Sequence, residues 1–158
     1  MQFDAELTDE LRARYGVTEA WGWVMPHVVR WSECDLFGHV NHAAYFTWFE
    51  DIRTFGFEAD GLPRMTRTTP GTSIVDLQMR YAKPLHYADE VLVTGRVLEI
   101  RTTSFTMEYG VWRDGLVAMC RTVLVLMINA TGEKVPIPDP IRLRWTTRDG
   151  ARDARVPG

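Results

Sequence analysis

Cysteine is scarce in this chain: the 158 residues include only Cys34 and Cys120. Two cysteines do not make a disulfide framework, and they fit reduced thiols in a reducing compartment. Long hydrophobic runs are also missing, which argues against membrane insertion. The N-terminal residues lack the basic and apolar segments of a secretory signal. We therefore expect a cytoplasmic protein.

Basic residues do not outnumber acidic ones, with 18 Lys and Arg against 21 Asp and Glu. The formal net charge is −3 and the pI is about 5.8, values that argue against a nucleic-acid partner. Hydrophobic residues make up 46% of the chain and charged residues 25%, which is typical of an ordinary globular protein. A chain of this length can bury a core without help from disulfides or a metal.

Most of the polar chemistry lies in residues 31–55. The residues that crowd the turn in this stretch are Asp35, Gly38, His39, Asn41 and His42. Behind the turn, apolar side chains recur at spacings of three and four, which predicts a helix. The N–H groups in the first turn of a helix have no partner within the helix, so they can polarise a carbonyl or bind an oxyanion.

The remaining sequence predicts mostly β-structure. Residues 3–15 form an amphipathic pattern that ends at Gly16, which indicates a short helix. Residues 24–32 read as a first strand, with Pro26 at its start or on a sheet edge. A long loop is predicted for 56–72. Four further strands are predicted at 74–82, 91–100, 104–113 and 116–128, with a tight hairpin at Asp114-Gly115.

These elements favour an α+β fold in which an antiparallel sheet curls around one helix. The nearly continuous apolar strand 116–128 should lie centrally in that sheet. We expect the main domain to span 23–141, preceded by an N-terminal helical appendage at 1–22. The Arg-rich segment 142–158 is expected to be a partly disordered tail.

The segment 28–53 resembles the 4-hydroxybenzoyl-CoA thioesterase-like branch of the hotdog-fold superfamily. Its pattern D-x-x-G-H-V-N-x-x-x-Y runs from Asp35 to Tyr45, and further landmarks of the family lie at 80–91 and 132–138. The likeness covers residues 24–138. It implies a hotdog fold, a long central helix wrapped by a five-stranded antiparallel sheet, in a homodimer or homotetramer. It also implies hydrolysis of acyl-CoA thioesters to free acid and CoA, without a cofactor.

By this resemblance, Asp35 is the catalytic carboxylate, either as general base for water or as nucleophile on the thioester carbonyl. The alternative is that Asp35 only stabilises the turn through its side chain. His42 matches the position whose backbone N–H helps to bind the thioester oxygen, and its imidazole is either catalytic or bonded to a nearby carbonyl. Asn41 is the expected helix N-cap, and His39 is expected to bond across the loop.

Other residues are candidates for positioning or binding the substrate. Glu50 shares a helix face with His42 and Phe46, so it could point into the pocket, although a glutamate at this position more often pairs with Arg53 or packs against the neighbouring sheet. Phe37 and Phe46 are the aromatic side chains expected in the pocket. The cations that could meet CoA phosphates are Arg64, Arg67, Arg80, Lys83 and Arg101, though such charges are commonly solvated. The two turn histidines, with no further Cys/His pair, do not make a metal site.

Three functions follow from these observations. The first is an acyl-CoA thioesterase, and the second is a thioesterase that acts on acyl-carrier-protein thioesters. The third is a non-catalytic acyl-CoA-binding module, against which the presence of Asp35 argues. The resemblance also places the strand at 73–82 on a sheet edge, where it would pair with its copy in a second chain.

Overall fold

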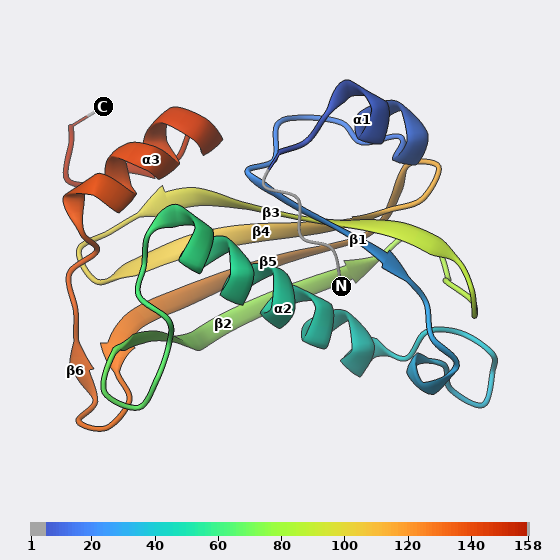
Figure 1. Ribbon diagram of the computed structural model, residues 1–158, viewed down its shortest axis with the longest axis horizontal. Helices are drawn as coiled ribbons and strands as arrows, with labels where there is room; N and C mark the ends of the chain where they lie inside the picture. The colour runs from blue at the N-terminus through green and yellow to red at the C-terminus, as the bar shows by residue number, and fades with distance from the viewer. Residues whose placement is uncertain (1–5, 158) are drawn as a thin grey trace.

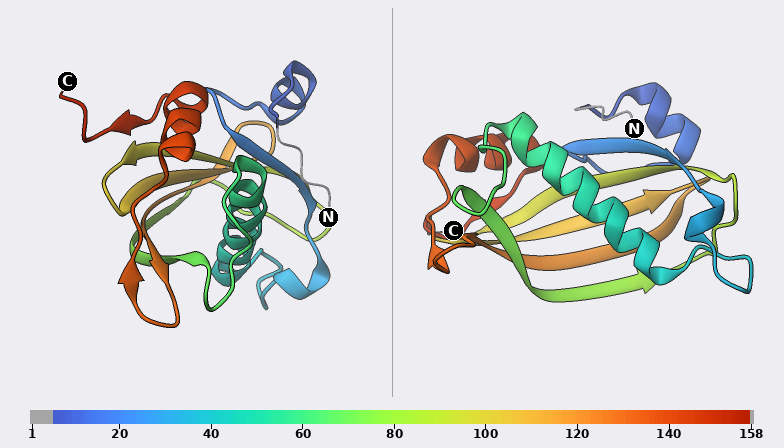
Figure 2. Two further views of the ribbon diagram at one scale, coloured as in Figure 1. Left: turned by 60° about the vertical axis from the view of Figure 1, so that its left-hand side comes forward. Right: turned by 60° about the horizontal axis from the view of Figure 1, so that its bottom comes forward.

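The computed structural model describes residues 6–157 and is built around one long helix, α2 (His42–Asp60). A curled antiparallel sheet wraps around this helix (Figure 1, Figure 2). In spatial order its main strands are β1 (Trp23–Val28), β3 (Glu90–Ile100), β4 (Ser104–Trp112), β5 (Leu116–Ile128) and β2 (Pro70–Tyr81). The predicted hotdog architecture, a central helix wrapped by five antiparallel strands, is confirmed.

The two faces of the sheet have different roles. Side chains alternate between the faces along each strand, so Met25 and Val93 join the main core with α2, whereas Val24 and Leu92 point the other way. On that outer face they pack with residues of the short helix α1 (Asp9–Tyr15) and the segment after it. The N-terminal segment therefore covers part of the outer surface of the sheet (Figure 1).

Local signals in the sequence set several of the turns. Asp114 and Gly115 both have positive φ, 50° and 100°, as the tight hairpin between β4 and β5 requires. Helix α2 ends at Gly61, whose φ of 102° lies in the left-handed region that favours glycine. Strand β5 lies between β4 and β2, so its predicted central position is confirmed.

Two element boundaries near the N-terminus differ from the prediction. Helix α1 begins at Asp9, because the side chain of Thr8 accepts a hydrogen bond from Leu11 N and caps the helix there. Residues 6–8 are not helical, and 3–5 lie outside the described residues. Strand β1 ends at Val28, and a 3₁₀ turn, η1 (Trp31–Glu33), replaces the rest of the predicted strand.

The predicted loop at 56–72 is shorter in the structure, where it covers 61–69. Helix α2 continues through Gly56 because that glycine lies against the ring of Trp23, where a Cβ atom would come within 2.4 Å of Trp23 Cδ2. The glycine therefore marks a close contact between helix and sheet rather than a loop. Within residues 6–157, no helix has both the length and the apolar character needed to cross a membrane.

The prediction of a partly disordered C-terminal tail is wrong. Residues after Pro138 form helix α3 (Asp139–Asp149) and a short strand, β7 (Arg152–Asp153), which pairs in parallel with β3. A second short strand, β6 (Glu133–Lys134), pairs with β5. The segment is ordered because several of its arginines bond to buried or half-buried partners.

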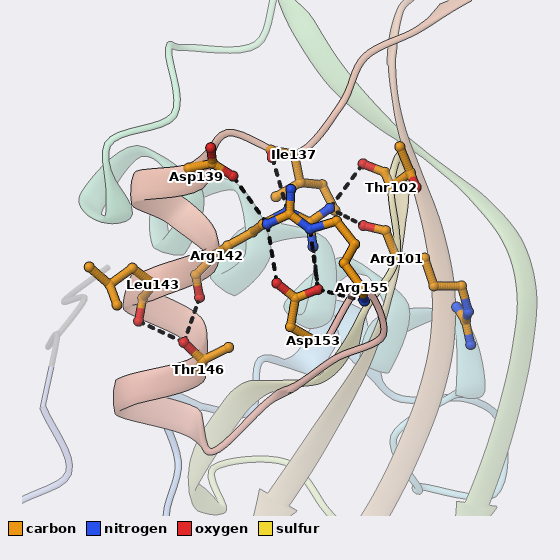
Figure 3. Close-up of polar contacts among 9 residues, drawn as sticks. All are labelled: Arg101, Thr102, Ile137, Asp139, Arg142, Leu143, Thr146, Asp153 and Arg155. Atoms are coloured by element: carbon orange, nitrogen blue, oxygen red, sulfur yellow. Dashed lines mark hydrogen bonds and ion pairs between the residues drawn. The ribbon is translucent and has the colours of Figure 1, made fainter. Parts of the chain in front are cut away.

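Arg142 shows how these arginines hold the segment in place. Its buried guanidinium donates to the carbonyl oxygens of Ile137, Arg101 and Thr102 and to the carboxylate of Asp153 (Figure 3). One cation thus joins α3 to the turn between β3 and β4 and to the last strand. The partners come from three separate parts of the sequence, so no local pattern reveals them.

Asp60, the last residue of α2, makes a second anchor for α3. Its carboxylate is 1% exposed and accepts hydrogen bonds from Arg144 Nε at 2.8 Å and Trp145 Nε1 at 2.7 Å. Arg148 adds two further hydrogen bonds, from Nη1 at 2.6 Å and Nη2 at 3.1 Å. A buried carboxylate with this many charged donors fixes the C-terminal end of α2 against α3.

We predict that Asp60→Asn lowers the free energy of unfolding by about 2 to 4 kcal/mol, because it leaves the buried indole of Trp145 and the half-buried guanidinium of Arg148 without their carboxylate. The matched control is Asp139→Asn. Asp139 also pairs with an arginine, Arg155, but its side chain is 82% exposed, so its loss should cost under about 0.5 kcal/mol. Urea denaturation measures both; equal losses would show that Asp60 is no anchor.

Candidate active site

The turn before α2 and the end of β2 line an open cavity of about 390 Å³. Among its lining residues are four that the sequence singled out: Asp35, His39, His42 and Lys83. Tyr45 and Tyr81, one from α2 and one from β2, line it as well, with ring centroids 5.3 Å apart. The structure therefore brings the polar turn, the N-terminus of α2 and the end of β2 to one place.

The two carboxylate oxygens of Asp35 have different surroundings. Oδ1 accepts hydrogen bonds from Phe37 N at 2.9 Å and His39 N at 3.4 Å, which is the turn-stabilising role considered from the sequence. The backbone of Asp35 also bonds to His39 and Gly38 across the turn. Within residues 6–157, Oδ2 has no hydrogen-bond partner. One oxygen thus holds the carboxylate in place, and the other is available for chemistry.

In the first turn of α2, one backbone N–H group has no hydrogen-bond acceptor among the described residues. Asn41 is the N-cap, as predicted, and its Oδ1 accepts from Ala43 N at 2.8 Å and Ala44 N at 3.2 Å. The N–H of His42 has no acceptor among the described residues. It lies at the positive end of a 19-residue helix and beside the cavity, so it can donate to a substrate oxygen.

Glu33 positions this turn, and sequence reasoning missed it. Its Oε2 accepts from Arg30 N at 2.8 Å and lies 2.9 Å from His27 Nε2, while its Oε1 accepts from Trp48 Nε1 at 2.8 Å. The carbonyl of Glu33 also accepts from Asn41 N. Glu33 therefore ties β1, η1 and α2 together. The sequence carried no clear signal for this role, because Arg30 lacks the side-chain acceptor of a capping box and only its backbone N–H bonds to Glu33.

The environment of Glu33 favours its ionised form. Burial alone raises the pKa of the carboxyl group, but the hydrogen bonds from Arg30 N, Trp48 and His27 outweigh that effect, so the net pKa is lowered. The carboxylate is thus a stable charged acceptor at neutral pH. It can hold Trp48, on α2, at a fixed distance from the turn that carries Asp35.

Several predicted site residues lie elsewhere. Phe37 is in the turn, but its side chain is exposed and does not line the cavity. Glu50 and Phe46 line a separate cavity further along α2. The predicted phosphate-binding cations that are not at the site are Arg64, Arg67, Arg80 and Arg101.

The reasons for these positions are geometric. Arg80 precedes Tyr81 on β2, and because neighbours on a strand face opposite ways, Arg80 lies on the outer face, in a groove with Glu108 and Arg121. Arg64 and Arg67 follow the far end of α2, which at 19 residues is roughly 28 Å long. Arg101 pairs with Glu99 at the distant end of β3.

Lys83 is the predicted cation that does line the cavity, and its Nζ donates to the carbonyl of Asp114 at 2.9 Å. His39 packs its ring edge-to-face against His86, with centroids 5.1 Å apart. In the part of the chain that the structure describes, no three His, Cys, Asp or Glu side chains gather in a metal-binding arrangement.

The chain is similar in sequence and in fold to proteins named as thioesterases and esterases. Residues 29–144 match the model of the Thioesterase-like superfamily. A solved thioesterase-superfamily protein from Jannaschia sp. CCS1 has a TM-score of 0.85 and is 30% identical, over 98% of this chain and 99% of that one. The Aquifex aeolicus protein named "Putative esterase" is 31% identical over 116 residues, which is 72% of this chain and 89% of that protein.

A third similar protein is a thioesterase from Thermus thermophilus, which was solved in complex with coenzyme A and zinc. It is 25% identical to this chain and has a TM-score of 0.69, with 84% of this chain and 98% of that one covered.

We predict that Glu33→Gln lowers the free energy of unfolding by about 1 to 3 kcal/mol at pH 7, because one amide oxygen cannot replace two carboxylate oxygens. The folded-state pKa of Glu33 lies below the ordinary value of 4.5, so its stabilisation is present above that pH. It is lost as the pH falls through the lowered pKa. The difference between wild type and variant should therefore shrink in acid.

Urea denaturation at pH 7 and at acidic pH measures this difference. The control is Glu58→Gln, an exposed carboxyl group on α2, which should change stability by less than about 0.5 kcal/mol. A Glu33→Gln defect that stays constant with pH would contradict the role of the ionised carboxylate.

Proposed function

This chain belongs to the thioesterase-like superfamily, and from that premise we propose that it hydrolyses acyl-CoA thioesters to a free acid and CoA. The observation that carries the proposal is the pairing of two groups at one cavity. Asp35, whose Oδ2 is unused, and His42, whose N–H is unpaired, both line this cavity. A base or nucleophile and an oxyanion donor are the two groups that acyl transfer requires.

In the proposed reaction, the thioester oxygen accepts a hydrogen bond from His42 N–H, which stabilises the negative charge that develops on it. Asp35 removes a proton from a water molecule as that water attacks the carbonyl carbon, or attacks the carbon itself and is later released by water. The C–S bond then breaks, and the thiol leaves as a thiolate that needs little protonation. Each route consumes one water and needs no other reactant.

Coenzyme A is the proposed carrier of the acyl group. The Thermus relative was crystallised with coenzyme A, which supports this choice. Lys83 lies at the rim of the cavity and is the predicted cation best placed to meet a CoA phosphate. Turnover of acyl-CoA at a higher kcat/KM than acyl-carrier protein would support the proposal, and tight binding without turnover would contradict it.

We predict that Asp35→Asn lowers kcat by about 10² to 10⁴ and leaves KM little changed. Asparagine keeps the Oδ1 acceptor that bonds Phe37 N and His39 N, so the turn should survive while the carboxylate is lost. Far-UV circular dichroism checks the fold alongside the kinetics. A folded variant that retains most of the activity would remove Asp35 from the mechanism.

We also propose that the working enzyme is a dimer or a larger even oligomer, joined through β2. This strand is at the edge of the sheet, with β5 on one side only. Its exposed apolar side chains include Ile74, Val75 and Tyr81. An exposed apolar edge strand is an aggregation hazard unless it pairs, and pairing with its copy across a two-fold axis would satisfy its backbone. The cavity lies at the end of the same strand.

We predict that Val75→Glu, which places a charge at this edge, converts the oligomer to monomers and lowers activity at least about tenfold. Val75 is 60% exposed, so folding should be retained. The control is Leu143→Glu, at a 69% exposed position on α3, which should leave assembly unchanged. Sedimentation velocity at assay concentrations measures both; wild-type monomers with full activity would contradict the proposal.

A further inference from the structure

A second cavity, of about 200 Å³, lies between α2 and the inner face of the sheet, next along α2 from the proposed thioester site. Its walls are mostly apolar and include Phe46, Phe49, Ile74 and Leu77. Arg53 also lines the cavity, although it is only 7% exposed. A buried cation is unusual in such surroundings and needs a physical account.

Arg53 has no negative partner in the described part of the chain. Its Nη1 donates to the hydroxyl of Tyr109 at 3.2 Å, but no carboxylate of residues 6–157 lies within 4.0 Å of its guanidinium. Buried Arg142 and half-buried Arg148 differ in this respect, since Arg142 pairs with Asp153 and Arg148 with Asp60. A buried charge without a counter-charge is strongly unfavourable. An anionic group bound next to Arg53 would therefore stabilise this buried charge.

The polar neighbours of Arg53 do not neutralise it. Burial raises the pKa of Tyr109 to about 12 and that of Cys120, which also lines the cavity, to about 11. Both groups therefore stay protonated and uncharged near neutral pH. Glu50 lines the cavity too, but it is exposed and forms no ion pair with Arg53. The charge of the Arg53 guanidinium is therefore not neutralised at the buried end of the cavity.

The helix aligns this charge with the proposed oxyanion site. Arg53 is eleven residues after His42, which at 3.6 residues per turn brings both to the same face of α2, with Phe46 and Phe49 between them. The separation along the axis is roughly 16 Å, and helical side chains lean toward the N-terminus, so the guanidinium reaches back toward His42. An acyl chain with its carbonyl at His42 would pass Phe46 and Phe49 on its way to Arg53.

We propose that the preferred substrate carries a carboxylate at the far end of its acyl chain, and that Arg53 binds this carboxylate. The inference rests on the proposed function, because it names the acyl group of the same reaction. The apolar walls fit the methylene chain, and the unpaired guanidinium fits the anionic end. The hydroxyl of Tyr109 positions Arg53.

The test compares adipoyl-CoA with hexanoyl-CoA, together with their shorter and longer homologues. These pairs differ only in whether the chain ends in a carboxylate or a methyl group. Wild type should favour the carboxylated member of the best pair by about 10- to 100-fold in kcat/KM, the range for a hydrogen-bonded charge. Arg53→Met should abolish this ratio, and Arg53→Lys should restore part of it.

The matched control is Arg121→Met, which removes an exposed arginine on the outer face of the sheet and should leave the ratio unchanged. Thermal denaturation checks that each variant is folded. A wild-type ratio near one overturns the proposal. So does a ratio that survives in Arg53→Met, because Arg53 would then serve structure or pair with a carboxylate of a second copy of the chain.

A binding measurement separates this proposal from the proposed function. Thioether analogues of adipoyl-CoA and hexanoyl-CoA, in which the carbonyl is replaced by a methylene group, cannot be hydrolysed. Calorimetry should give a Kd about 10- to 100-fold lower for the carboxylated analogue in wild type but not in Arg53→Met. If no thioester is hydrolysed but this difference holds, only the catalytic proposal fails. Equal Kd values for the two analogues overturn the role of Arg53.

Discussion

The hydrogen bonds accepted by the Glu33 carboxylate hold the candidate site together. They join His27 on β1, Arg30 at the start of η1 and Trp48 on α2, three elements that also meet through apolar contacts and through the hydrogen bond from Asn41 N to the Glu33 carbonyl. Because apolar contacts are non-directional, they do not define where a turn lies to within the tolerance that catalysis needs. The directional bonds of Glu33 set the position of the turn that carries Asp35 relative to the helix that presents His42 N–H.

Helix α2 is anchored by a carboxylate near each end, that of half-buried Glu33 and that of buried Asp60. Glu33 holds its first turns, and Asp60 joins its last turn to α3. Along its length the helix packs on β1 and β3, while the side that faces β2 borders both cavities. The molecule therefore combines a rigid helix with open space beside it. Under the proposed function, a thioester and its acyl chain lie in that space.

Features encoded by neighbouring residues could be predicted from the sequence. The cap at Asn41, the hairpin at Asp114-Gly115 and the alternating strands each depend on a few adjacent side chains. The resemblance then supplied the five-stranded sheet around the helix and the edge position of the 73–82 strand. It also supplied the pairing of Asp35 with the His42 amide, because the motif spans both residues.

Features that depend on distant partners could not be predicted. Helix α3 was missed because its arginines resemble a solvated tail until Asp60, more than eighty residues earlier, is brought beside them. The loop was predicted to begin at residue 56, several residues too early, because nothing nearby in the sequence shows that Gly56 lies against the Trp23 ring inside the helix. The outward position of Arg80 was available from strand alternation, and the error was to give more weight to its charge than to its place next to Tyr81.

The central claim is that the first free amide of α2 receives the thioester oxygen while Asp35 faces the carbonyl carbon. A crystal structure of the Asp35→Asn variant with an acyl-CoA substrate tests it most directly, since the variant should bind the substrate and turn it over slowly. The account predicts the carbonyl oxygen within about 3 Å of His42 N and the residue-35 side chain on the side from which water attacks. A thioester carbonyl that lies away from the N-terminus of α2 would contradict it.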